Sequence, residues 1–245
     1  MFPPQVVDEL VQARKGKIFT DIIISCDGHE IHAHKIIICS HSPVFRAALT
    51  GQYVEAKGVY NIPDFPYPMV QRMVDYFYKG TYEINVDPNG QPCDTGILST
   101  HATMFALGNK YLVEGLMTLA AKEYQAALRN DTGVCDFLLC LTEVYQLTDE
   151  NETRLRNVAL CYARENLASS LGSPETKEIF DRVADKVPEF AKHLLDSYLE
   201  QPLLGRCHGC GRDHLVPVEC LQCRCKKCGR GGATPWNPVR KDNLC

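Results

Sequence analysis

The sequence predicts an α+β domain, followed by an all-helical extension and a small cysteine-rich tail. Asp27-Gly28 is a strong two-residue hairpin signal that follows a short β-branched apolar segment. From Thr100 onward, apolar residues recur with helical spacing through the middle third of the chain. Six cysteines fall within 22 residues, from Cys207 to Cys228. Short strands, then helices, then a metal-type motif indicate a mixed domain with two additions.

Local signals in the first 80 residues predict short elements in a mixed order. The apolar spacing of residues 6–15 is helical, and Gly16 closes that segment. Ser42-Pro43 supplies a cap and a first-turn proline for the helix that follows. The expected elements are a helix at 6–15, strands at 22–26 and 30–34, an apolar segment at 35–39, a helix at 44–49, a strand at 59–62 and a helix from Pro68.

The rest of the chain up to residue 200 is expected to be helical. The pattern is helical from Thr100 to Ala127, and two further apolar stripes lie at 137–145 and 155–163. Asp149, with Glu152 three residues later, resembles a capping box for the second stripe. Ser173-Pro174 begins a last helix, which Pro188 is expected to kink or split.

Several stretches in the first half resemble a BTB/POZ domain, a protein-interaction module without chemistry of its own. They are TDIII from Thr20, HAHK from His32, SHSPVFRAAL from Ser40, MVQRMVDYFYKGTYEI from Met69 and ALGNKYLVEGLMTLA from Ala106. The resemblance implies a BTB/POZ fold, a short mixed sheet with helices, in an α+β class. It is closest to the short fungal kind, since the first helical segment runs almost directly into the first strand.

Three domains are therefore expected: a BTB/POZ domain at 17–121, a helical extension at 122–202 and a cysteine-rich tail at 203–245. The tail differs electrostatically from the rest. From Leu203 onward there are eight Lys and Arg against three Asp and Glu, although the whole chain has a formal net charge of -4. A basic end on an acidic body is typical of a separate module.

The resemblance to the BTB/POZ family implies two partner-binding sites. In the family, an acid before the first strand and a base after the Ala-His pair line a charged pocket near the dimer face; here these are Asp21 and Lys35. Alternatively, Asp21 only caps a strand and Lys35 is solvated. Some members recruit a cullin-type ubiquitin-ligase scaffold through an apolar-x-Glu motif, which Tyr53-Val54-Glu55 matches. Alternatively, Glu55 simply faces solvent.

The cysteines near the end predict a zinc-ribbon-like tail with a structural zinc ion. Thiolates two residues apart can reach one ion, and a following glycine permits the tight turn. The expected ligands are Cys207, Cys210, Cys225 and Cys228. Cys220 and Cys223 are the alternative second pair, and a disordered tail with free thiols is the other interpretation. The remaining scattered cysteines are interpreted as inert buried thiols.

These features favour an interaction protein over an enzyme. No G-x-G-x-x-G, P-loop, H-E-x-x-H or G-x-S-x-G motif occurs. Neither a signal peptide nor an apolar run of about 18 residues occurs, so an intracellular protein of nucleus or cytoplasm is expected, without membrane partners. The first hypothesis is an adaptor or scaffold that self-associates or binds a cullin. The alternative is a chromatin-associated regulator whose basic tail contacts nucleic acid.

Overall fold

The computed structural model describes residues 3–50, 58–84, 96–130, 132–148, 152–200, 204–207, 211–219, 224–225 and 233–235, the last four ranges as backbone. The chain forms two compact units, Met1–Arg129 and Asn130–Cys245. Helix α6 (Glu114–Arg129) runs without a break across residue 121, where the first domain was expected to end. The first unit therefore closes with the end of this helix.

A three-stranded sheet organises the first unit, in the order β2-β1-β3. The central strand β1 (Ile22–Cys26) pairs antiparallel with β2 (His29–Ala33) and parallel with β3 (Val59–Asn61). Both turn residues of the β1–β2 hairpin have positive φ, +48° at Asp27 and +74° at Gly28, as the Asp-Gly signal predicted. The Asp27 carboxylate also accepts the backbone N–H of Tyr67 at 2.9 Å, which ties the hairpin to the start of a helix.

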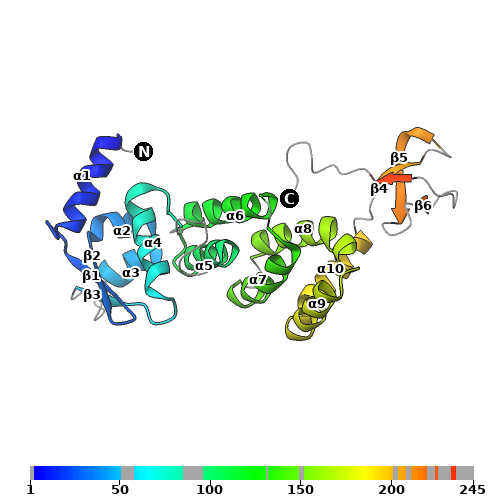
Figure 1. Ribbon diagram of the computed structural model, residues 1–245. Helices are drawn as coiled ribbons and strands as arrows, with labels where there is room; N and C mark the ends of the chain where they lie inside the picture. Colours follow the sequence, from blue (N-terminus) through cyan, green and yellow to red (C-terminus); the bar gives the residue numbers. More distant parts are fainter. Residues whose placement is uncertain are drawn as a thin grey trace. The chain divides into compact units, whose positions relative to one another are not determined.

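The described part of the first unit also contains six helices (Figure 1). They are α1 (Pro4–Lys15), α2 (Lys35–His41), α3 (Pro43–Thr50), α4 (Tyr67–Lys79), α5 (Ile97–Lys110) and α6. The helical pattern expected from Thr100 to Ala127 is two helices, because the chain turns between α5 and α6. Leu112 sits at that turn with a φ of +52°, a left-handed conformation that no helix interior contains. This break was not predicted, because Leu is a strong helix former.

The core of the first unit centres on Phe45 of α3. Its ring stacks on Tyr111 with centroids 4.6 Å apart and meets Tyr60 and Phe77 edge-on. Ser42 fixes this arrangement: its hydroxyl accepts the backbone N–H of Phe45 at 3.1 Å and donates to the Tyr111 carbonyl at 2.6 Å. The predicted cap at Ser42 is thus confirmed, and it also fastens α3 to the end of α5.

Four helices begin the second unit. They are α7 (Val134–Leu147), α8 (Arg154–Ser170), α9 (Pro174–Lys186) and α10 (Pro188–Glu200). Pro188 splits the last helical segment, as predicted. Buried Arg156 of α8 caps the C-terminal end of α7. Its guanidinium donates to the Thr148 hydroxyl at 2.9 Å and to the Tyr145 carbonyl at 3.2 Å. Asp149 of the expected capping box lies outside the described residues.

Four strands form a small antiparallel sheet in the tail, ordered β6-β5-β4-β7. They are β4 (Leu204–Cys207), β5 (Gly211–Glu219), β6 (Arg224–Cys225) and β7 (Ala233–Pro235). The apolar residues 215–218 are part of β5. Among the described helices, none is long and apolar enough to cross a membrane.

The scattered cysteines differ in their chemical state. Cys26, Cys39, Cys135 and Cys140 are free thiols, and burial raises the pKa of Cys26. Cys161 is disulfide-bonded. The expectation of free buried thiols is therefore confirmed for Cys26 and Cys140, whereas Cys39 and Cys135 are only half-buried and Cys161 is not free; Cys93 lies outside the described residues.

We predict that Gly108→Ala destabilises the first unit by about 1–3 kcal/mol. A Cβ there would lie 2.7 Å from Met117 Cγ and 3.0 Å from Met117 N. The methionine side chain can yield, but its backbone cannot move without shifting α6, so this clash outweighs the gain of about 1 kcal/mol in helix propensity. Denaturant unfolding measures the change.

Gly96→Ala is the control, because a Cβ at this start of α5 meets nothing within 4 Å. It is expected to cost less than about 1 kcal/mol. Equal losses for the two variants would contradict the close approach of α5 and α6.

Candidate protein-interaction surface

Asp21 and Lys35 are brought together by the backbone of the first unit. The Asp21 carboxylate accepts the backbone N–H of Lys35, the first residue of α2, at 2.7 Å. The Asp21 backbone N–H donates to the Ala33 carbonyl at 3.1 Å. Asp21 therefore caps a helix rather than a strand, and its negative charge lies at the favourable end of that helix. Its role toward a partner remains a prediction.

The turn between α1 and β1 exposes two apolar residues that sequence reasoning missed. Phe19 is 89% exposed and Ile18 is 52% exposed. Lys17 and Phe19 both have left-handed backbones, with φ of +56° and +57°. The Ile18 backbone N–H donates to the Ala13 carbonyl of α1 at 2.8 Å. A bulky residue with positive φ is uncommon, so this turn is held by its surroundings.

Buried His34 connects this turn to α2. The carbonyl of Ile18 can only accept, so His34 Nε2 carries a proton and donates to it at 2.9 Å. The Tyr78 hydroxyl accepts the backbone N–H of His34 at 2.9 Å and donates to His34 Nδ1 at 2.6 Å. These bonds fix the orientation of the imidazole ring, with Nε2 toward Ile18 and Nδ1 toward Tyr78. His34 directly precedes α2, so Ile18 is fixed beside the first turn of that helix.

Ile36 completes an exposed apolar group on this side of the unit. It lies two residues after His34 in α2 and is 78% exposed. We refer to Ile18, Phe19 and Ile36, with Asp21 and Lys35 beside them, as the docking face. Single exposed apolar residues are ordinary, but here the bonds from Ile18 to His34 and from Asp21 to Lys35 hold the two segments that carry these three residues next to each other, which indicates an interaction surface.

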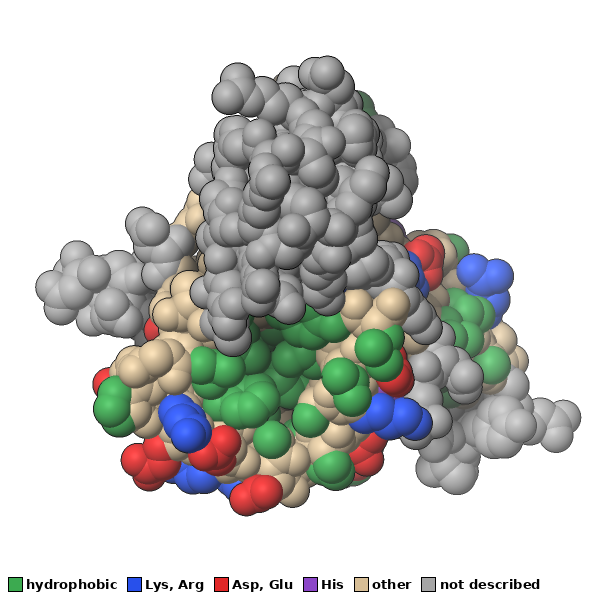
Figure 2. Space-filling model, turned by 90° about the vertical axis from the view of Figure 1, so that its right-hand side faces the viewer, with side chains coloured by type: hydrophobic (Ala, Val, Ile, Leu, Met, Phe, Trp, Pro, Cys, Tyr) green, Lys and Arg blue, Asp and Glu red, His purple; other side chains and the backbone are tan. Residues whose placement is uncertain are grey.

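The second unit also exposes apolar side chains. Leu139 of α7 and Leu195 and Leu199 of α10 are each more than half exposed. Figure 2 shows hydrophobic side chains gathered in one area of the face it presents, with charged side chains around them. Among the described contacts, no hydrogen bond joins any of these three leucines to another helix, in contrast to Ile18 of the docking face.

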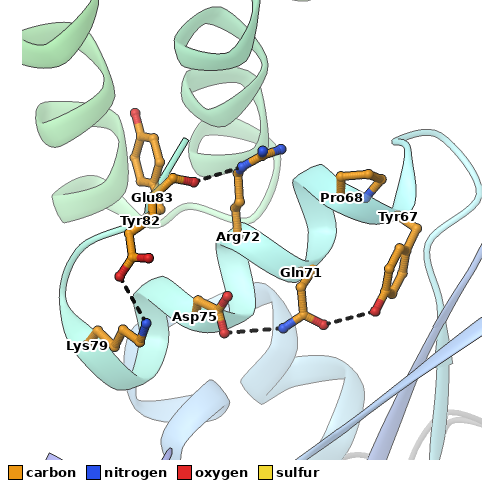
Figure 3. A pocket seen from close by; sticks show the side chains of 8 residues that line it. All are labelled: Tyr67, Pro68, Gln71, Arg72, Asp75, Lys79, Tyr82 and Glu83. Carbon is orange, nitrogen blue, oxygen red and sulfur yellow. Dashed lines mark hydrogen bonds and ion pairs between the residues drawn. The ribbon is translucent and has the colours of Figure 1, made fainter. Parts of the chain in front are cut away.

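A shallow pocket of about 250 Å³ lies along α4 (Figure 3). Its polar groups bond to one another: Gln71 links Tyr67 to Asp75 at 3.4 and 3.2 Å, and Lys79 pairs with Glu83 at 3.2 Å. Its residues are Tyr67, Pro68, Gln71, Arg72, Asp75, Lys79, Tyr82 and Glu83. Asp75 also pairs with buried Arg14 of α1, so this polar network helps to hold α1 against α4.

The other predicted site residues are only partly described. Tyr53 and Glu55 lie outside the described residues, and so do Cys210 and Cys228. Cys207 ends β4 opposite Gly211, whereas Cys225 of β6 lies opposite Val218. The pairing register therefore aligns these two cysteines with opposite ends of β5 and does not by itself bring them together. The zinc site, with either second pair, remains a prediction.

Comparison with known proteins identifies the first unit. Residues 10–128 match the family model of the BTB/POZ domain. A mouse relative, TD and POZ domain-containing protein 2, is 30% identical over 115 residues, which are 46% of this chain and 29% of that protein. Protein maternal effect lethal 26 of Caenorhabditis elegans is 27% identical over 177 residues, 71% of this chain and 40% of that protein. The chain thus matches less than half the length of either relative.

Among solved structures, the BTB domain of zebrafish PATZ1 aligns with a TM-score of 0.39 and 13% identity, over 48% of this chain and 86% of that chain. The assignment rests on the family model and the sequence relatives. The three-stranded sheet with its helices agrees with the predicted fold, while the fungal form remains a prediction. Residues 10–128 of this protein are a BTB/POZ domain.

Proposed function

We propose that this protein is an intracellular adaptor or scaffold that self-associates through the docking face of its BTB/POZ domain. The observation that carries this function is the group of exposed apolar side chains, Ile18, Phe19 and Ile36, held beside Asp21 and Lys35. Burying one such side chain contributes about 1.5–3 kcal/mol, so three on each copy can support association.

A second copy of this chain is the partner that the charges favour. In a two-fold symmetric interface the same patch meets itself, so a residue contacts its counterpart's neighbour in both directions. Asp21 and Lys35 lie next to each other, with the Asp21 carboxylate on the Lys35 backbone. Such a patch can match the acid of one copy with the base of the other, which fixes the orientation more than it adds affinity.

Ile36→Glu is expected to weaken self-association by more than about 100-fold, because it would bury a carboxylate in an apolar interface. Ile36 is 78% exposed, so the fold should keep its thermal stability. Analytical ultracentrifugation over a concentration series measures the monomer–dimer equilibrium. Leu139→Glu, at an exposed site of the second unit, is the control. This proposed function would be wrong if the wild-type chain stayed monomeric at high concentration. It would also be wrong if the Ile36→Glu variant associated as the wild type does.

Recruitment of a cullin-type scaffold is the more specific form of this proposal. It is supported by the family resemblance and by the apolar-x-Glu triplet Tyr53-Val54-Glu55. Glu55→Lys should weaken binding of a purified cullin N-terminal domain by more than about tenfold, because the charge is reversed. Glu30→Lys, at an exposed glutamate of β2, should leave it unchanged. If the wild-type chain shows no binding in a calorimetric titration, the cullin role is wrong, while self-association stands.

The alternative function, nucleic-acid association through a zinc-stabilised tail, is supported by the eight basic residues from Leu203 onward and by strand β5, which lies between the cysteine pairs. We expect native mass spectrometry to detect one zinc ion, which Cys207→Ser abolishes and Cys39→Ser leaves in place. DNA affinity should fall steeply with added salt and be lost with the zinc. A zinc-free wild-type chain would contradict the metal site, and salt-independent binding would contradict the phosphate contacts.

A further inference from the structure

A buried polar pair, His34 and Tyr78, lies next to the docking face. His34 and Tyr78 are both buried, and neither belongs to the exposed residues that would touch a partner. Two hydrogen bonds join Tyr78 to His34, and a third joins His34 to the carbonyl of Ile18 in the turn that carries Phe19. A buried polar network of this kind specifies one geometry, because each unmade bond would leave an unsatisfied group.

The conformation of the turn is one that the chain would not choose by itself. Lys17 and Phe19 are both left-handed, with φ of +56° and +57°, and neither residue is Gly or Asn. Such backbones persist only where neighbouring contacts determine them. Two contacts hold the Ile18 backbone: its N–H bonds to Ala13 of α1, and its carbonyl bonds to His34 Nε2. Without the second, the turn keeps its bonds to the end of α1 and its internal bond from Thr20 to the Lys17 carbonyl, but it loses its link to α2, so Phe19 is held less firmly.

Tyr78 orients the His34 ring for that bond. The Tyr78 hydroxyl bonds to both the backbone N–H and Nδ1 of His34, and this holds the ring with Nε2 facing the Ile18 carbonyl. Burial raises the pKa of Tyr78, so its phenol stays protonated at neutral pH. The Arg14 guanidinium lies 4.9 Å from the centre of the Tyr78 ring, and Arg14 pairs with Asp75, so the ring itself is held from the α1 side.

We propose that Tyr78 and His34 are positioning residues for self-association: they lock the Ile18–Phe19 turn against the start of α2, and so present Phe19 and Ile36 to a second copy as one preorganised pair of anchors. This inference rests on the proposed self-association. The expected gain is in preorganisation, since a rigid aromatic anchor loses little conformational entropy on binding.

Tyr78→Phe tests the proposal, because it removes only the hydroxyl and keeps the ring beside Arg14. It should weaken self-association about tenfold in analytical ultracentrifugation. Tyr67→Phe is the matched control on the same helix, where the hydroxyl makes one bond of 3.4 Å to Gln71. Hydrogen exchange should become faster at the amides of residues 18 and 19 in Tyr78→Phe and not in Tyr67→Phe.

Phe19→Ala keeps the result interpretable if Tyr78→Phe also lowers the stability of the domain. Phe19 is 89% exposed, so its removal should weaken association about tenfold or more without changing the thermal midpoint. The double variant should associate no more weakly than Phe19→Ala alone, because Tyr78 acts through the turn. Additive losses, or normal association of either single variant while Ile36→Glu dissociates, would overturn the inference and leave the proposed function standing. A chain whose association Ile36→Glu leaves unchanged, or which is monomeric, would overturn both.

Discussion

The stacking of Phe45 on Tyr111 is the contact on which the first unit depends. It joins α3, which follows the hairpin, to the end of α5, more than 60 residues later in the sequence. Ser42 bonds to both partners, so the cap of one helix and the carbonyl end of another share a single hydroxyl. The sheet lies on the side of Tyr60, whose ring meets Phe45 edge-on. The cap of α3 and the long-range packing of Phe45 on Tyr111 thus involve the same few residues. These contacts stabilise the domain that carries the docking face.

Sequence reasoning succeeded where a single residue type decides the backbone. Asp27-Gly28 forms the hairpin because both positions need positive φ, and Pro188 separates two helices because it has no N–H to donate. It failed at Leu112, which takes the left-handed position of a local helix-ending motif that Gly usually fills: the N–H of Leu112 bonds to the Asn109 carbonyl, and the N–H of Val113 bonds to the Gly108 carbonyl. Gly108 lets these helices approach closely, and that approach depends on a neighbour, Met117, that no local pattern reveals.

The same distinction holds for the candidate site. The resemblance to the BTB/POZ family predicted that Asp21 and Lys35 lie near each other, and in the fold the Asp21 carboxylate accepts the backbone N–H of Lys35. The exposed Ile18–Phe19 turn was not, since apolar residues next to a predicted strand are normally assigned to the core. The exposure of both side chains, and the bond between Ile18 and His34, 16 residues apart, are seen only in the folded structure. An apolar pair between Lys17 and Thr20, outside any periodic stripe, was the available signal.

The hairpin turn has one more consequence, which is mechanical. Asp27 bonds to the first N–H of α4, and His29 stacks on the Tyr67 ring with centroids 4.3 Å apart. The tip of the hairpin is therefore fastened twice to the same helical end, by a charge-assisted bond and by an aromatic pair. A force applied at this tip would therefore be transmitted directly to α4. The hairpin and the helix would move together as one rigid body.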